Sequence, residues 1–117
     1  MSVSRGDVVL VDYPFSDRTG SKVRPALVVQ TDTLNHRMTD TILVAISRST
    51  HRASATQLFI DLKTPEGAQS GLRQDSMVQC ENILTFDQRL IIASIGSLVS
   101  PLMQRIDACL KTALHLT

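Results

Sequence analysis

The sequence predicts a mainly β fold of the α+β class, a small barrel-like sheet of about five to seven short strands with a C-terminal α-helix. Three observations predict it: short β-branched runs bounded by Gly, Pro, Asp or Ser, one uninterrupted apolar run near the middle, and helical periodicity at the end. Because 117 residues suffice for one domain with its own core, we expect residues 1–117 to form a single domain.

Five runs are predicted to be strands, because each is short, rich in apolar or β-branched residues and bounded by turn-forming residues. They are Asp7–Tyr13, Arg24–Gln30, Thr41–Ser47, Gln57–Asp61 and Ser76–Cys80. The third run is apolar almost throughout, which is typical of a central strand buried on both faces. A further apolar run, Leu90–Ile95, fits either a strand or a short helix.

The last part of the chain is predicted to be a helix. Ser100 is of a type that caps helices, and Pro101 suits a first turn. Apolar residues then recur on one face, namely Leu102, Ile106, Cys109, Leu110, Ala113 and Leu114. We expect this face to pack on the sheet, and the alternative is that it helps to build a dimer.

The charge balance argues against tight, sequence-independent binding of duplex nucleic acid. Twelve basic and 11 acidic residues give a net charge of +1, although local basic clusters surround Arg24 and His51. Cys80 and Cys109 lack metal or redox spacing and are expected to be reduced, buried thiols. Reduced thiols, with no signal-like or membrane-spanning apolar run, predict a cytoplasmic protein without a membrane partner. The three histidines lack metal-ligand spacing, so we expect no metal and no cofactor.

The stretch from Gly6 to Gln30 is the most informative about function. Two apolar runs bracket a polar segment that ends at Val23-Arg24-Pro25. Proline restricts the residue before it to extended conformations, so Arg24 is presented from a stiff backbone. A permanently charged guanidinium beside a loop suits phosphate recognition. From the residues alone, an ion pair that fastens the loop explains Arg24 at least as well.

Pieces spread in order along nearly the whole chain match one known family. They are Gly6-Asp7-Val8-Val9, Tyr13-Pro14-Phe15-Ser16-Asp17, Gly20-Ser21-Lys22-Val23-Arg24-Pro25-Ala26-Leu27-Val28, Asn35, Asp40-Thr41-Ile42-Leu43-Val44-Ala45-Ile46-Ser47, Gly71-Leu72, Asp75-Ser76-Met77-Val78, Thr85-Phe86-Asp87 and Ser100-Pro101. In these pieces the chain resembles the MazF/PemK-type toxins of bacterial toxin–antitoxin systems, in their Ser-Lys-x-Arg-Pro subgroup.

The resemblance implies an SH3-like barrel that works as a homodimer. It implies a toxin that inhibits translation and growth as a metal-independent endoribonuclease, cutting single-stranded RNA (mRNA) at a short motif. A cognate antitoxin protein would cover the RNA-binding groove, and DNA would be contacted only through the antitoxin complex.

Carried over residue by residue, the resemblance implies two catalytic side chains. Arg24 stands at the family's catalytic arginine, and Ser47 at its catalytic threonine, with the hydroxyl kept. The loop that covers RNA falls on the segment from Ser16 to Val23. The resemblance therefore implies substrate contacts at Ser16, Asp17, Gly20, Ser21 and Lys22.

The chain departs from the family pattern at two places. It has Gly20-Ser21-Lys22 where the best-studied members carry a Glu-Gln pair. A large subgroup of the family shows the same Ser-Lys form as this chain. It has Gln79-Cys80-Glu81 where some members carry Arg-x-Asp, so Gln79 is a candidate for RNA contact and Glu81 for catalysis. His51 is a further candidate for phosphate contact, and its simpler account is a solvated loop.

Metal-free RNA cleavage uses the 2′-hydroxyl as nucleophile and leaves a 2′,3′-cyclic phosphate and a 5′-hydroxyl. Preorganised donors stabilise the charge that develops on the phosphate oxygens. Arg24 offers bidentate donors and Ser47 a further hydroxyl. The proton acceptor is open between Glu81, Asp17 and His51, with Glu81 first.

Two other functions fit the same pattern. One is a gyrase-poison-like toxin of the same fold, which would block a protein target without cutting RNA. The other is a catalytically degenerate member that only binds RNA or antitoxin. The C-terminal Lys-Thr-Ala-Leu-His-Leu-Thr shows no feature that favours the gyrase poison.

Overall fold

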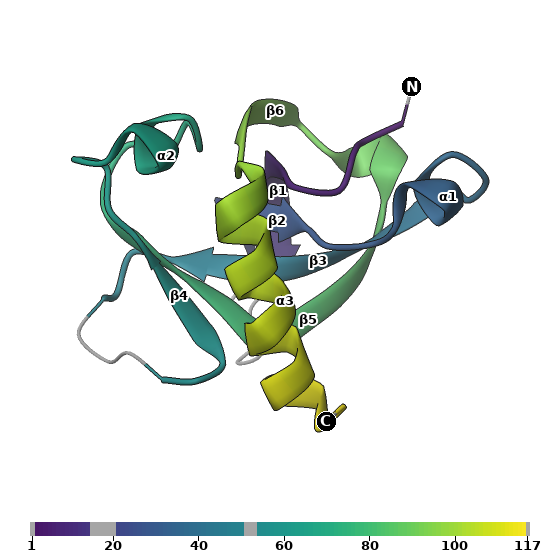
Figure 1. Ribbon diagram of the computed structural model, residues 1–117. Coiled ribbons are helices and arrows are strands. Elements are labelled where there is room, and N and C mark those ends of the chain that lie inside the picture. Colours follow the sequence, from purple (N-terminus) through teal and green to yellow (C-terminus); the bar gives the residue numbers. More distant parts are fainter. Residues whose placement is uncertain (1, 15–20, 51–53, 117) are drawn as a thin grey trace.

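A computed structural model of the chain describes residues 2–14, 21–50 and 54–116. These residues form one antiparallel sheet of six strands in the order β4-β5-β3-β2-β1-β6, with helix α3 lying across one face (Figure 1). The strands are β1 (Asp7–Pro14), β2 (Ser21–Val28), β3 (Asp40–Ser47), β4 (Gln57–Ile60), β5 (Ser76–Asp87) and β6 (Ala93–Ser97). The helices are α1 (Asp32–Asn35), α2 (Pro65–Ala68), the 3₁₀ turn η1 (Gln88–Leu90) and α3 (Ser100–Leu114).

The sheet is strongly curled and makes a half-barrel, which confirms the predicted mainly β fold with a C-terminal helix. Within the described residues, the two end strands β4 and β6 do not pair with each other. The curl leaves a hollow face, and α3 fills it (Figure 1).

Strand β3 is central in the sheet, as its apolar run predicts. Its residues from Leu43 to Ile46 are buried, and three of them, Leu43, Val44 and Ile46, contribute to two separate cores. On the α3 side, Val44 and Ile46 belong to a cluster that includes Ile106 of α3. On the opposite side, Leu43 packs with apolar residues of β1 and β2. A strand covered on both faces needs apolar side chains at nearly every position, and this explains the lack of alternation.

Helix α3 packs through Met103, Ile106 and Cys109, which are its buried residues. The expected cap at Ser100 is wrong: Val99 occupies the N-cap position without a side-chain hydrogen bond, and Ser100 is already helical. Leu114 is 50% exposed because the helix runs beyond the sheet at its C-terminal end. The periodicity therefore predicted the helix and most of its face but not where the contact ends.

Strand β5 is much longer than the predicted Ser76–Cys80 and continues to Asp87. Its pairing with β3 is interrupted by a bulge, because Val44 faces Ile83 while Ala45 faces Gln79. Three residues of β5, 80–82, thus have no partner on β3. The polar residues at the bulge look like the end of a strand in the sequence, but the strand resumes after them.

The undecided run Leu90–Ile95 divides between two elements, since η1 ends at Leu90 and β6 begins at Ala93. Strand β6 pairs with β1, and Gly71 lies directly against it. Gly71 has φ +74°, and a Cβ there would overlap the carbonyl of Ile95, so only glycine fits this close approach.

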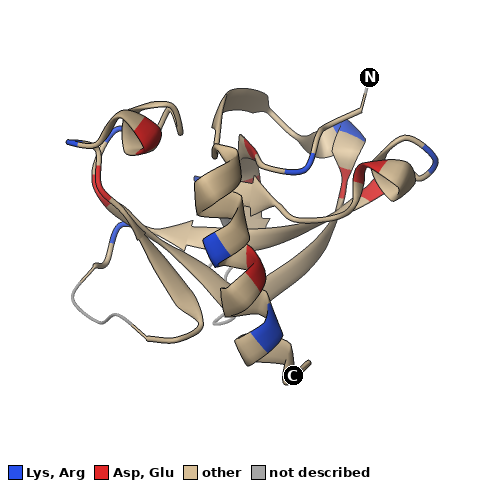
Figure 2. Cartoon of the chain, viewed as in Figure 1, with Lys and Arg blue, Asp and Glu red and all other residues tan. Residues whose placement is uncertain are grey.

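Positive and negative side chains are interspersed over the elements, as the net charge of +1 leads one to expect (Figure 2). Of the helices in the described ranges, none combines the length and apolar character needed to cross a membrane.

Candidate active site

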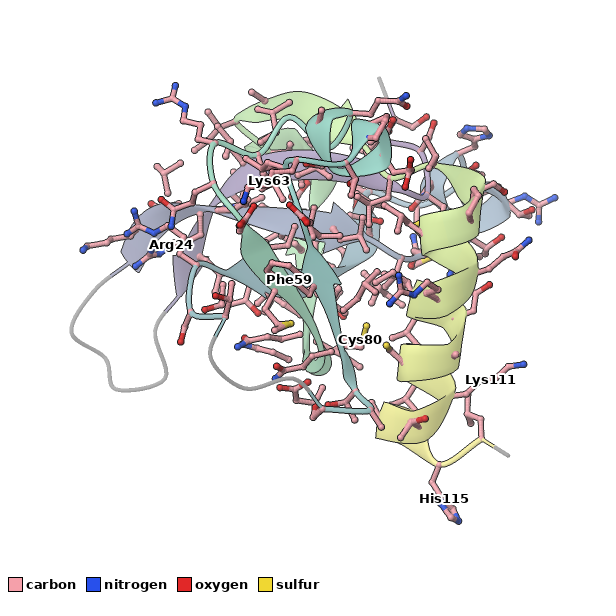
Figure 3. All side chains as sticks on the ribbon, turned by 60° about the vertical axis from the view of Figure 1, so that its left-hand side comes forward. Arg24, Phe59, Lys63, Cys80, Lys111 and His115 are labelled. Atoms are coloured by element: carbon pink, nitrogen blue, oxygen red, sulfur yellow. The ribbon has the colours of Figure 1, made fainter. Side chains whose placement is uncertain are left out.

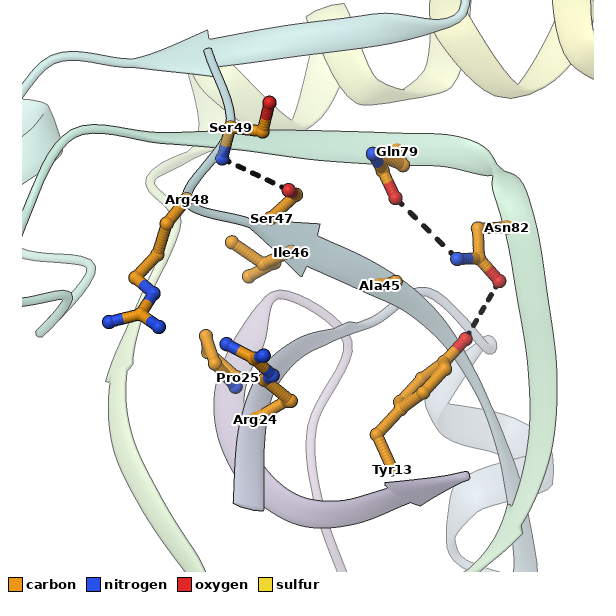
Figure 4. Close-up of a pocket in the computed structure, with 10 residues that line it drawn as sticks. All are labelled: Tyr13, Arg24, Pro25, Ala45, Ile46, Ser47, Arg48, Ser49, Gln79 and Asn82. Atoms are coloured by element: carbon orange, nitrogen blue, oxygen red, sulfur yellow. Dashed lines mark hydrogen bonds between the residues drawn. The ribbon is translucent and has the colours of Figure 1, made fainter. Parts of the chain in front are cut away.

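A cavity of about 470 Å³ opens where β2 and β3 separate (Figure 4). The ladder between these strands ends at the pair Ala26 and Ala45. Continuing the same register would set Arg24 opposite Ser47. Pro25 lies between and has no N–H to donate, so the ladder cannot continue through it. Arg24 and Ser47 both line the resulting cavity.

The cavity lies on the face of the sheet away from α3. Arg24 and Ser47 share the strand parity of Ala26 and Leu43, which belong to the core cluster opposite the helix. The side view shows Arg24 and α3 at opposite sides of the molecule (Figure 3). The helix therefore supports the sheet from behind and leaves the cavity open.

Ser47 is oriented by its neighbour. Its Oγ accepts a hydrogen bond of 3.1 Å from the backbone N–H of Ser49 (Figure 4). A hydroxyl whose oxygen is held in this way still has its hydrogen to donate. Ser47 is thus prepared to donate to an anion in the cavity.

The bulge in β5 builds the opposite wall. In a regular strand, Gln79 and Asn82 would point to opposite faces, because their spacing is odd. Both line the cavity here, since the unpaired residues between them change the direction of the strand. Tyr13 of β1 completes this wall and donates a hydrogen bond of 2.9 Å from its hydroxyl to Asn82 Oδ1. Burial raises the pKa of Tyr13 above its ordinary value of 10.0, so the phenol keeps its proton at neutral pH.

The described side chains that line the cavity include two guanidinium groups, of Arg24 and Arg48, and no carboxylate. A second cavity of about 590 Å³ adjoins it and shares Arg24, Pro25 and Arg48. Lys22 and Arg73 also line this second cavity. The electrostatic environment on both sides of Arg24 therefore favours an anion, and the chemistry of the donors fits phosphate.

The remaining predicted site residues lie outside the first cavity or outside the described residues. Glu81 is exposed and outside the lining of both cavities; its oxygens accept hydrogen bonds from Thr56 Oγ1 (2.9 Å) and Gln57 Nε2 (2.6 Å). Ser21 is the first residue of β2. Ser16, Asp17, Gly20 and His51 lie outside the described residues.

Sequence reasoning missed Asn82 as a residue of the site. Its signal would have been the bulge, and neither composition nor periodicity reveals that β5 loses three pairings there. Arg48 was visible only as part of a basic cluster, because nothing in the sequence indicates that it borders two cavities. In the described part of the chain, no group of three or more His, Cys, Asp or Glu side chains could hold a metal ion.

Fold and site together define a class of protein: a curled antiparallel sheet, backed by one terminal helix, that carries an arginine and a hydroxyl in a cationic cavity on the face away from the helix. A family model described as PemK-like, MazF-like toxin of type II toxin–antitoxin system matches residues 4–114. The chain is 33% identical to Endoribonuclease EndoA of Bacillus subtilis (strain 168) over 99% of its own length and 97% of that protein. The chain belongs to this family of PemK-like, MazF-like toxins.

Solved structures show the same fold at lower sequence identity. One is an endoribonuclease in complex with its cognate antitoxin from Mycobacterial species, with a TM-score of 0.79, 22% identity and coverage of 99% of this chain and 98% of that one. Another is the Mycobacterium tuberculosis toxin MazF-mt6, with a TM-score of 0.77, 22% identity and coverage of 95% and 98%. A third is MazE-MazF from Deinococcus radiodurans, with a TM-score of 0.70, 16% identity and coverage of 97% and 96%.

Proposed function

We propose that this toxin is a metal-independent endoribonuclease that cleaves single-stranded RNA at a short motif, with Arg24 and Ser47 as catalytic residues. The observation that carries the proposal is that Pro25 ends the β2–β3 ladder and leaves these two side chains in one cavity. The EndoA relative, at 33% identity, is named an endoribonuclease, which supports the reaction class.

The reaction divides into donor and acceptor roles. The 2′-oxygen attacks the adjacent phosphorus while a base takes its proton; the bond from phosphorus to the 5′-oxygen breaks, and that oxygen gains a proton. Arg24 stabilises the charge on the non-bridging oxygens through two N–H groups, and Ser47 adds an O–H donor. The products are a 2′,3′-cyclic phosphate and a 5′-hydroxyl.

Glu81 is our proposed proton acceptor. Each of its oxygens accepts one hydrogen bond and keeps another lone pair for a proton. Since Glu81 lies outside the cavity lining, the scissile phosphate has to bind at the edge of the cavity for the adjacent 2′-hydroxyl to come within hydrogen-bond reach of Glu81. Lys22, at the second cavity, contacts a flanking phosphate, and the segment that holds Ser16, Asp17, Gly20 and Ser21 covers the strand of RNA.

The proposal includes the partners of the toxin. A cognate antitoxin protein binds over the RNA-binding face, and DNA is reached only through that complex. The toxin works as a homodimer; Val23, which is 55% exposed beside the second cavity, is available for such a contact. It acts in the cytoplasm, in agreement with its two free cysteines.

Substitution of Arg24 tests the function. Purified wild-type protein, incubated with a long single-stranded RNA and EDTA, is expected to make discrete cuts that leave 2′,3′-cyclic phosphates. Arg24→Ala is expected to lower the cleavage rate by at least about 10²-fold, the usual cost of losing a donor to a developing anion.

Arg89→Ala is the matched control, because Arg89 is 75% exposed and paired with Asp87 instead of lining the cavity. Its cleavage rate should equal that of the wild type. If folded wild-type protein makes no cuts, the proposed reaction is wrong, and a DNA-supercoiling assay then tests the gyrase-poison function.

A further inference from the structure

Tyr13, Asn82 and Gln79 form a chain of two hydrogen bonds along one wall of the cavity, and both bonds run in the same direction. The Tyr13 hydroxyl donates to Asn82 Oδ1 at 2.9 Å, and Asn82 Nδ2 donates to Gln79 Oε1 at 3.5 Å (Figure 4). In this arrangement the amide oxygen of Asn82 faces the Tyr13 hydroxyl. The amide nitrogen of Asn82 then faces Gln79.

The hydrogen bond from Asn82 also orients the side-chain amide of Gln79. Its oxygen is turned to Asn82, and its nitrogen lies on the side away from Asn82 (Figure 4). Gln79 is only partly buried, so its N–H groups are open to a ligand. The guanidinium groups of Arg24 and Arg48 can only donate as well. The cavity thus presents hydrogen-bond donors on both sides.

An amide that is held in one orientation has a different base preference from a side-chain amide that is free to turn. A free Gln or Asn pairs with adenine, because it accepts from N6 and donates to N7. Gln79 has its oxygen on the side of Asn82, so its nitrogen is the polar atom on the other side of the amide. The corresponding edge of guanine, with acceptors at both O6 and N7, suits a surface of donors.

From this geometry we propose that the cavity selects guanine over adenine at one position beside the cleaved bond, with Gln79 reading the base and Tyr13 and Asn82 acting as positioning residues. The inference rests on the proposed endoribonuclease function for its substrate. The bulge is essential to it, because only the three unpaired residues of β5 bring Gln79 and Asn82 to one wall.

The test uses short RNAs that contain the mapped cleavage motif and differ at one purine. Guanine and inosine, which share O6 and N7, should be cleaved alike. Adenine and 7-deazaguanine, which each lack one of the two acceptors, should be cleaved at least about fivefold more slowly, as loss of one good base contact predicts. Equal cleavage of guanine and adenine, or no effect of the 7-deaza substitution, would overturn the proposal.

Two variants test the positioning roles. Tyr13→Phe keeps the ring and removes the hydroxyl, so the amides are free to turn and the ratio of guanine to adenine cleavage should fall toward one, mainly through KM. Asn82→Asp still accepts from Tyr13 but cannot donate to Gln79. The Gln79 nitrogen then turns to the carboxylate, and the preference should shift toward adenine. A loss of stability alone would change both substrates equally.

Gln69→Ala is the matched control, because Gln69 is an exposed glutamine that lines neither of the two cavities beside Arg24. Its base preference should equal that of the wild type. Binding of short oligonucleotides that differ in one purine, carry 2′-deoxyribose throughout and are chosen without reference to a cleavage motif separates this inference from the function. Guanine preference in binding without any cleavage would support the inference and refute the ribonuclease function. Cleavage without a base preference would support the ribonuclease function and refute the inference. The absence of both cleavage and base preference would refute both.

Discussion

At Ser47 the chain offers a hydroxyl whose oxygen already accepts the backbone N–H of Ser49. That contact fixes the oxygen without using its hydrogen, so the side chain is prepared to donate before any substrate arrives. Arg24 is prepared in a different way, by the restricted backbone before Pro25. Preorganisation of this kind is what stabilises a developing anion at little cost when the reaction occurs.

Ser47→Ala removes this donor and is expected to slow cleavage by roughly 10²-fold. Ser47→Thr keeps the hydroxyl and should retain most of the activity. Single-turnover cleavage of a short RNA measures both, with circular dichroism to confirm folding. Ser94→Ala, on the exposed part of β6, serves as control. Wild-type rates in Ser47→Ala would remove Ser47 from the catalytic residues.

Among the elements, the connection from β2 to β3 depends on one buried amide. Asn35 of α1 is 1% exposed; it accepts hydrogen bonds from Gln30 Nε2 (2.9 Å) and Thr41 Oγ1 (2.7 Å) and donates to the carbonyl of Gln30 (3.0 Å). A helix of a single turn has little stability of its own. The amide therefore holds α1 in place and fixes the start of β3.

Asn35→Ala should lower the free energy of unfolding by about 2–4 kcal/mol, because the buried Thr41 hydroxyl and the Gln30 carbonyl lose their hydrogen bonds to the amide. Urea denaturation followed by circular dichroism measures the change. His36→Ala, at the exposed neighbouring position, should stay within about 0.5 kcal/mol of the wild type. A similar loss in both variants would mean that α1 itself, and not the amide, supplies the stability.

The sequence predicts some of these elements and not others. The existence of strands β1 to β4 and of helix α3 follows from apolar runs and periodicity, because their apolar side chains meet a core. The bounds of β2 were predicted less well, since it covers Ser21–Val28 instead of Arg24–Gln30. The full length of β5 and its bulge could not be predicted in this way, because the direction of residues 80–82 depends on the pairing of β5 with β3. Arg24 and Ser47 could be selected as site residues from the resemblance, but only the folded structure reveals that Asn82 lines the same cavity.

For the molecule as a whole, the contact between sheet and helix includes two thiols, Cys80 of β5 and Cys109 of α3. Both thiols are buried in the core that joins β5 to α3. Burial raises the pKa of Cys80 from 9.0 to about 12, and it also raises the pKa of Cys109. The folded protein thus holds these protons more tightly than the unfolded chain does.

The buried Cys80 thiol makes the stability of the protein fall at alkaline pH. Stability from the protonated thiol is complete below the unfolded pKa of about 9 and is lost as the pH rises toward about 12. The free energy of unfolding of the wild type should therefore fall more steeply over this range than that of Cys80→Ala, which lacks the group. Parallel pH profiles for the two proteins would show that the thiol does not contribute.

The bulge in β5 has a consequence for how such a protein can diverge. Pairing on either side of it is anchored separately, by Gln79 with Ala45 and by Ile83 with Val44. A residue gained or lost between these anchors changes what faces the cavity without shifting either half of the ladder. Evolution can thus alter the base that the toxin reads at this point while the sheet, the helix contact and Arg24 stay as they are.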